Sequence, residues 1–183
     1  MFCYQCQETS KNEGCTIQGV CGKTADVANL QDLLMFLCKG ISHYTVRLRK
    51  LGIEIPQINK FITDSLFMTI TNANFDKSRF ITRILMAYEM RNAAEERLLS
   101  AGGSRAGITF DGAFWRGDTE EEMAEKAVET TILTTENEDI RSLRELTIYG
   151  LKGMAAYAEH AFNLGYEENE IYGFMQRALV DVT

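Results

Sequence analysis

Four of the chain's five cysteines lie together near its start, and this segment constrains the fold more than any other feature. They are Cys3, Cys6, Cys15 and Cys21, with the spacing C-x2-C-x8-C-x5-C. Gly14, Gly19 and Gly22 lie among them. Four thiols on one short, glycine-bearing segment are typical of a tetrathiolate metal site. The rest of the chain must then supply a support for this loop.

The spacing leaves the identity of the centre open. Thiolates are soft ligands that select Fe–S clusters, zinc or Cu(I). Structural zinc sites usually have two short Cys pairs separated by a longer spacer, whereas only the first pair here is short. An Fe–S cluster is larger than one ion and is often wrapped by a single compact loop. The spacing therefore favours an Fe–S cluster, with structural zinc, disulfides and unrelated structural cysteines as alternatives.

The charge around the loop favours the same centre. An oxidised [4Fe–4S] core with four thiolates is anionic, and Lys11 and Lys23 lie in or beside the loop. The first helix is expected to begin just after the fourth cysteine, so its positive dipole end would face the cluster. Backbone N–H groups of Gly14, Gly19 and Gly22 are expected to donate to the sulfur atoms.

Helical periodicity runs through the rest of the chain, and no stretch alternates as a strand would. The expected helices cover about 25–50, 59–71, 77–100, 119–130, 136–164 and 168–180. Thr24 is the expected N-cap of the first helix. Thr119 and Glu122 have the spacing of a capping box at the start of the fourth.

Short links between the first three helices predict an antiparallel bundle. The glycine-rich stretch 102–118 is expected to join this bundle to a second one, with a binding loop as the alternative. The sequence thus predicts an all-α fold of six helices in two three-helix bundles. The cluster loop covers 1–24, and the bundles cover about 25–101 and about 119–183.

The remaining candidate ligands fit structural roles. Cys38 lies within the first expected helix and is interpreted as a small buried hydrophobic residue. His43 and His160 lie on expected helices without a ligand partner one turn away. Glu159 directly precedes His160, which is not the Glu-x-x-His spacing of carboxylate-bridged di-iron bundles.

Composition excludes several classes of partner. The net charge is −7 and Lys and Arg do not cluster, which argues against nucleic-acid binding or an anionic membrane surface. No run approaches the roughly 20 apolar residues of a membrane span. A cytoplasmic location is expected, where reduced thiols more often bind metals than form disulfides.

Three segments of the chain resemble the first domain of the hybrid-cluster proteins, also called prismane proteins or hydroxylamine reductases. They are the opening MFCYQCQETSKNEGCTIQGVCGKT, ITNANFD at 70–76 and the stretch 135–161. The resemblance covers essentially the whole chain and implies a helical domain of two three-helix bundles. It also implies that Cys3, Cys6, Cys15 and Cys21 bind a [4Fe–4S] cubane, although relatives with other spacings hold a [2Fe–2S] centre.

The resemblance further implies an oxidoreductase. Members of the hybrid-cluster family reduce hydroxylamine to ammonia and have been linked to nitric oxide reduction. They receive electrons from an external donor protein. Their hybrid iron–sulfur–oxygen cluster is held by His, Glu and Cys residues of later α/β domains. In this chain only Cys38 remains once the quartet is used, so a second such cluster cannot be built.

This chain is therefore expected to be one piece of a longer protein, inactive alone, with the catalytic domains beyond Thr183. An exposed apolar patch is expected on its last three helices, where the missing domains would pack. The alternative is a zinc-stabilised helical interaction module without redox activity. A loop that has lost its metal and is disordered or disulfide-linked is a further alternative.

Overall fold

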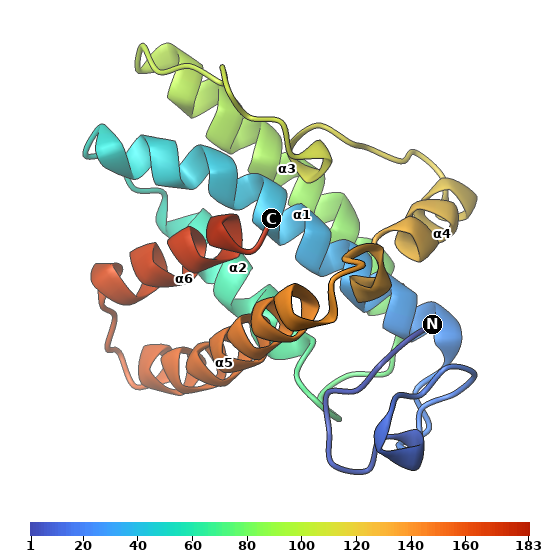
Figure 1. The fold of residues 1–183 in the computed structure, drawn as a ribbon. Helices are drawn as coiled ribbons and strands as arrows, with labels where there is room; N and C mark the ends of the chain where they lie inside the picture. Colours follow the sequence, from blue (N-terminus) through green and yellow to red (C-terminus); the bar gives the residue numbers. More distant parts are fainter.

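The computed structural model describes residues 1–183 and is built from helices (Figure 1). The six α-helices are α1 (Ala25–Lys50), α2 (Pro56–Met68), α3 (Lys77–Ser100), α4 (Glu120–Glu129), α5 (Glu138–Asn163) and α6 (Asn169–Asp181). Three short 3-10 turns are η1 (Ser10–Asn12), η2 (Asp111–Ala113) and η3 (Ile132–Thr134). The only β-type pairing is an isolated antiparallel bridge between Cys3 and Cys15. The prediction of an all-α fold with six helices is confirmed.

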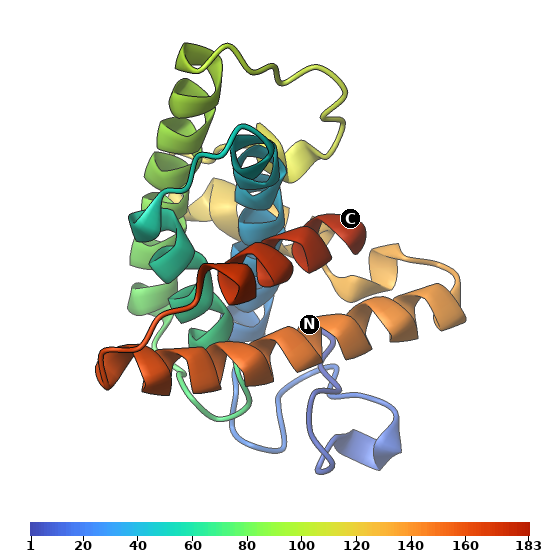
Figure 2. The ribbon, with the colours of Figure 1, turned by 90° about the vertical axis from the view of Figure 1, so that its left-hand side faces the viewer.

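Helix α1 is the central element, and α3 and α6 pack on it along with α4 and η2 (Figures 1 and 2). Its buried residues include the consecutive run 33–35, so more than one of its faces is covered. A helix that is apolar on several faces has to lie inside a fold. One hydrophobic cluster of 31 buried residues contains side chains from all six helices. The division into two three-helix bundles stays a prediction.

The caps of the helices agree in part with the sequence. The Thr119 side chain accepts from the N–H of Glu122, whose carboxylate accepts from the N–H of Thr119, so the capping box is confirmed. Thr24 does occupy the N-cap position of α1, but its hydroxyl donates to Asp26 and caps no backbone N–H. Asp76 caps α3 by accepting two backbone N–H bonds of the first turn.

Helix α2 begins and ends earlier than the sequence predicted. It spans Pro56–Met68, whereas residues 59–71 were expected. Pro56 lies in the first turn, where its fixed φ suits a helix. An N–H at this position would have no partner within the helix, so its absence costs no hydrogen bond. The proline therefore begins this helix, although the sequence placed it in the connection before it.

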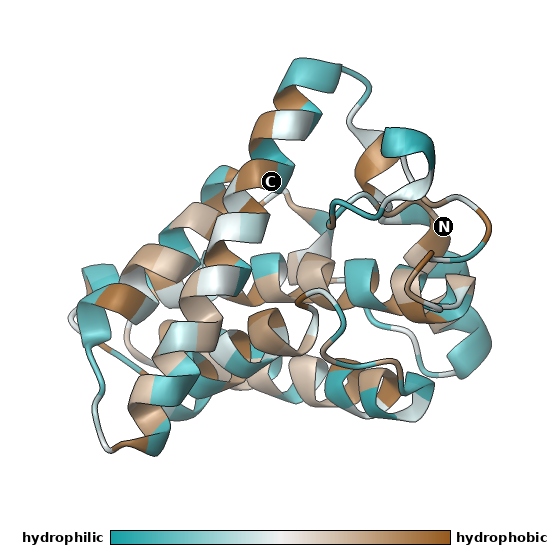
Figure 3. Cartoon of the chain, turned by 90° about the horizontal axis from the view of Figure 1, so that it is seen from below, coloured by the Kyte–Doolittle hydropathy of each residue, from teal (hydrophilic) through white to brown (hydrophobic).

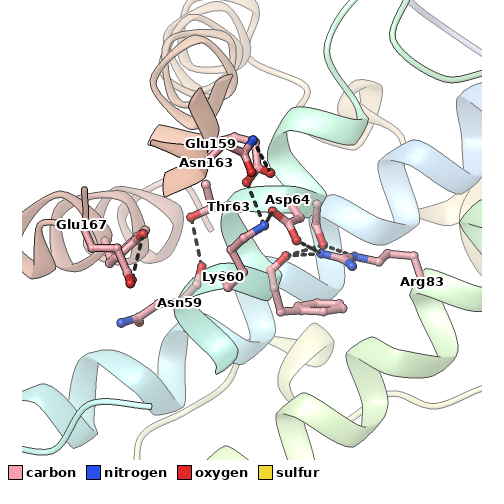
Figure 4. A network of polar contacts seen from close by, with 11 residues as sticks. Asn59, Lys60, Thr63, Asp64, Arg83, Glu159, Asn163 and Glu167 are labelled. Atoms are coloured by element: carbon pink, nitrogen blue, oxygen red, sulfur yellow. Dashed lines mark hydrogen bonds and ion pairs between the residues drawn. The ribbon is translucent and has the colours of Figure 1, made fainter. Parts of the chain in front are cut away.

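An ion-pair network joins α2 to α3 and α5 (Figure 4). The Lys60 ammonium lies 2.8 Å from a Glu159 carboxylate oxygen on α5 and 2.5 Å from Asp64 on its own helix. Arg83 on α3 lies 3.5 Å from Asp64 and donates to the Phe61 carbonyl at 2.8 Å. These side chains are partly exposed, so each pair contributes little by itself. Together they join α3 and α5 to α2.

The stretch 102–118 connects α3 to α4 and packs across α1. The Tyr44 hydroxyl of α1 donates to the Ala113 carbonyl at 3.1 Å, and Arg91 of α3 donates to the Trp115 carbonyl at 2.5 Å. The closest approach is between Gly40 and Gly112, because a Cβ at position 40 would lie 2.0 Å from the Gly112 carbonyl oxygen. This connection therefore depends on a missing side chain in α1.

Apolar side chains also reach the surface, and α5 carries more of them than any other helix. Exposed residues of this helix are Ile140, Leu143, Leu146, Tyr149 and Tyr157. Figure 3 shows hydrophobic and hydrophilic stretches alternating within the helices, as expected for amphipathic segments. None of the helices has the length and apolar character needed to span a membrane.

Gly40→Ala should lower the free energy of unfolding by about 1–3 kcal/mol, because the new methyl group overlaps the backbone of Gly112. Gly150→Ala on α5 is the matched control, since a Cβ there meets no atom within 4 Å. The control should raise the free energy of unfolding by roughly 0.5–1 kcal/mol through the higher helix propensity of alanine. Urea unfolding followed by far-UV circular dichroism measures both changes. Equal destabilisation by the two substitutions would contradict the close approach.

Candidate metal centre

Backbone pairing between Cys3 and Cys15 closes the cysteine loop. The N–H of Cys3 donates to the Cys15 carbonyl at 3.1 Å, and the N–H of Cys15 donates to the Cys3 carbonyl at 2.8 Å. Residues that exchange both bonds in this way have their side chains on the same face. The first and third cysteines of the quartet are therefore neighbours although they are far apart in the spacing pattern.

The loop lies at the N-terminal end of α1, as the sequence predicted (Figures 1 and 2). Helix α1 begins at Ala25, four residues after Cys21. Lys23 lies between them and is only 3% exposed. A helix start and a buried ammonium group both favour a nearby negative charge.

The Cys15 thiol is held in an environment that favours its thiolate form. The pKa of Cys15 is lowered, chiefly by the backbone N–H groups of Ser10 and Val20 near the sulfur. The Thr9 hydroxyl, 3.9 Å from the sulfur, and the charge of Lys23 act in the same direction, while burial acts against them. Hydrogen bonds to a thiolate are a usual feature of metal-bound cysteine. Cys15 is the only cysteine of the quartet that is buried.

The glycines of the loop do not donate to sulfur as the sequence predicted. The N–H of Gly14 donates to the Ser10 carbonyl, that of Gly19 to Lys23, and that of Gly22 to Gly19. Their roles are steric. A Cβ at position 14 would lie 2.5 Å from the Phe2 ring, and one at position 19 would lie 2.9 Å from the Cys21 sulfur. Gly22 has a φ of +90°, which residues with a side chain rarely adopt.

The four thiols of the quartet are free, with Cys3 and Cys6 half-buried, Cys15 buried and Cys21 exposed. No three Cys, His, Asp or Glu side chains gather around one point in this structure. The donor set nevertheless fits a tetrathiolate centre, because four unpaired thiols and a stabilised thiolate lie on one loop. To share one centre, the sulfur atoms have to lie closer together than they do here.

The other candidate ligands lie away from this loop. Cys38 is fully buried in the core, and burial raises the pKa of its thiol to about 12. His43 stacks on Phe110 with ring centres 5.6 Å apart, and burial lowers its pKa. His160 is exposed near the end of α5. None of the three belongs to a group of potential metal ligands.

Sequence reasoning singled out Lys23 beside the loop but missed the buried Lys152 behind it. The Lys152 ammonium of α5, 2% exposed, donates to the Gln5 side-chain oxygen and to the Thr69 carbonyl, both at 3.3 Å. Lys23 donates to Gln31 Oε1 at 2.6 Å. The only signal was a charged residue inside an apolar helical stretch, as at Lys152 after Leu151. Such a residue can be exposed or buried, and the spacing alone does not tell which.

Lys152 lines a cavity of about 160 Å³ between α1, α5 and the segment 129–135, with Gln5 of the loop at its edge. Asp32 and Lys39 of α1 face Glu145 and Lys152 of α5 across it. Burial raises the pKa of Asp32 to about 7, an effect that the charge of Lys152 opposes. Burial likewise lowers the pKa of Lys152 to about 8, against the attraction of Asp32.

A second hollow, of about 350 Å³, lies between the loop and α5. Tyr4 and Cys6 of the loop face Leu146, Tyr149 and Lys152 of the helix. The Tyr4 hydroxyl is buried and has no hydrogen-bond partner. Cys6 therefore borders a mainly apolar space that its side chain can enter.

Known proteins match the chain over its whole length. Residues 1–183 match the Prismane/CO dehydrogenase family. A hydroxylamine reductase of Parabacteroides distasonis is 60% identical over 184 residues, which cover 100% of this chain and 33% of the relative. Hydroxylamine reductases of Desulfitobacterium hafniense strain Y51 and Bacteroides thetaiotaomicron are 55% and 51% identical over 183 residues, covering 100% of this chain and 33% and 32% of the relatives. The chain thus spans about a third of the length of the curated relatives it matches.

Asp32→Asn should change how the stability of the chain depends on pH. The folded state holds the Asp32 proton up to about pH 7, while the unfolded state releases it near the ordinary value of 3.8. The contribution of Asp32 to stability is therefore present at low pH and is lost as pH rises from about 4 to 7. Asparagine cannot ionise, so D32N should gain at least about 1.4 kcal/mol relative to wild type between pH 5 and 7.5.

Urea unfolding of the metal-free chain at several pH values measures this difference. Asp181→Asn removes an exposed carboxylate at the end of α6 and serves as the control. Parallel stability curves for D32N and wild type would contradict the raised pKa of Asp32.

Proposed function

Because the chain belongs to the Prismane/CO dehydrogenase family, we propose that it is the iron–sulfur electron-transfer domain of a hydroxylamine reductase-like hybrid-cluster protein. In this proposal Cys3, Cys6, Cys15 and Cys21 bind a [4Fe–4S] cluster, with a [2Fe–2S] centre as the alternative. The observation that carries the proposal is the loop itself, in which four thiols are free and backbone pairing holds Cys3 beside Cys15.

Different residues of the loop would stabilise the proposed centre in different ways. When bound, an iron–sulfur cluster accepts and releases one electron at a time. Cys15 is held by Ser10 and Val20, and this hydrogen bonding favours the charged ligand. Backbone pairing keeps Cys3 beside it. Hydrogen bonds and burial around the sulfur atoms are the means by which a protein sets the reduction potential.

The exposed edge of the loop is suited to an external electron donor protein. Cys21 is exposed, and the neighbouring Ile17 and Val20 are 87% and 61% exposed. The opposite edge faces α5 and the buried charges. We therefore place entry of the electron at the Cys21 edge, where a donor can approach closely.

The parent reaction would take place in the remaining domains of the longer protein. Reduction of hydroxylamine breaks its N–O bond, and the electrons and protons supplied give ammonia and water. The names of the relatives support this substrate. Nitric oxide reduction is the alternative reaction proposed for the parent. The hybrid iron–sulfur–oxygen cluster that would bind the substrate lies outside this chain, whose one further cysteine, Cys38, is buried in the core.

Metal analysis of the chain purified without oxygen tests the cluster. Iron and acid-labile sulfide in equal amounts are expected, with an electron paramagnetic resonance signal after dithionite reduction. Serine at any one of Cys3, Cys6, Cys15 or Cys21 should remove most of the iron, because each thiolate is a ligand. Cys38→Ser is the matched control and should keep the cluster. One zinc ion per chain without sulfide would overturn the proposal in favour of a zinc-stabilised interaction module.

The iron-loaded chain should not reduce hydroxylamine when a reduced dye supplies the electrons. It should, however, be oxidised by a suitable acceptor, because its proposed role is transfer alone. Ammonia formation measured against a protein-free blank tests this expectation. Sustained turnover by the 183-residue chain would show that the catalytic site lies within it.

A further inference from the structure

Cations outnumber carboxylates by one in the lining of the cavity behind the cysteine loop. Its charged side chains are Lys39, Lys152, Arg141, Arg144, Asp32, Glu145 and Glu129. Lys152 is the buried cation of this set, at 2% exposure. A buried charge without a close partner is costly, so it favours an anion nearby. Besides Asp32 and Glu145, the anion that acts on Lys152 is the thiolate of Cys3.

Lys152 is the buried cation that touches the loop. Its ammonium donates only to neutral oxygens, those of Gln5 and Thr69. No carboxylate lies within ion-pair distance of it. Gln5 lies directly before Cys6, and the charge of Cys3 is among those that act on Lys152. Lys152 therefore links the charged cavity to the cysteine loop.

We propose that Lys152 is a positioning residue of the cysteine centre, which supplies the counter-charge of the thiolates and ties the loop to α5 through Gln5. This inference rests on the proposed function, since it requires an anionic centre held by the four cysteines. Reduction adds a negative charge to such a centre. A nearby buried ammonium stabilises the reduced form and raises the reduction potential, because charges interact strongly where water is excluded.

Redox titration of the iron-loaded chain, followed by electron paramagnetic resonance, tests the role of Lys152. In Lys152→Met the midpoint potential should fall by at least 59 mV, which corresponds to a tenfold change in the one-electron equilibrium constant. Lys152→Arg keeps the charge, so its midpoint potential should stay close to that of wild type. Lys50→Met is the matched control, because it removes an exposed lysine at the far end of α1. A midpoint potential unchanged in Lys152→Met would overturn the inference.

Glu145→Gln gives a second test with the opposite sign. Glu145 lies two helical turns before Lys152 and lines the same cavity. Removing its negative charge should raise the midpoint potential, whether or not Lys152→Met folds. A potential that falls, or stays the same, in Glu145→Gln would also overturn the inference.

Cobalt binding separates failure of this inference from failure of the proposed function. A Co²⁺ ion held by four thiolates is also anionic, so Lys152→Met should weaken Co²⁺ affinity at least tenfold relative to Lys152→Arg. If the chain holds zinc and no sulfide, the proposed function fails and the Co²⁺ affinities decide the role of Lys152. If the chain holds iron and sulfide, but neither the midpoint potential nor the Co²⁺ affinity changes in Lys152→Met, the inference alone fails. A chain that binds neither iron nor cobalt would overturn both.

Discussion

Burial of α1 on several faces is the constraint on which the rest of the structure depends. Consecutive apolar residues of this helix, such as those at 33–35, cannot all face one neighbour. They are covered only when α3, α4 and α6 pack on it together. The connection 102–118 covers a further part, through the contact between Gly40 and Gly112. The other helices are therefore arranged around α1.

The cysteine loop depends on this helical support. A segment of about two dozen residues cannot bury enough apolar surface to be stable by itself. It is attached at the start of α1 and held against α5 by the contact between Gln5 and Lys152. The same helices that form the core thus bring two buried cations, Lys23 and Lys152, behind the sulfur ligands. The fold and the electrostatics of the candidate site have a common origin.

Local patterns predicted the helices well, and the errors have local causes. Helices α1 and α3 have the predicted bounds, since each has a clear apolar period and a clear stop. Helix α2 was misplaced because Pro56 was interpreted as a connection, although proline also suits a first helical turn. The loop glycines do not donate to sulfur, because their N–H groups bond to backbone carbonyls of the loop. Their steric roles depend on contacts that form only in the folded loop.

The sequence by itself determined the helical class, most helix bounds and the four candidate ligands, because periodicity, capping and cysteine spacing are short-range properties. Only the tertiary structure decided that Cys3 and Cys15 pair, and that Lys152 is buried against Gln5. Lys152 and Gln5 are 147 residues apart, so no local pattern connects them. Burial of a charge depends on which distant helices pack over it. The chemistry around the thiols is therefore a product of packing as much as of spacing.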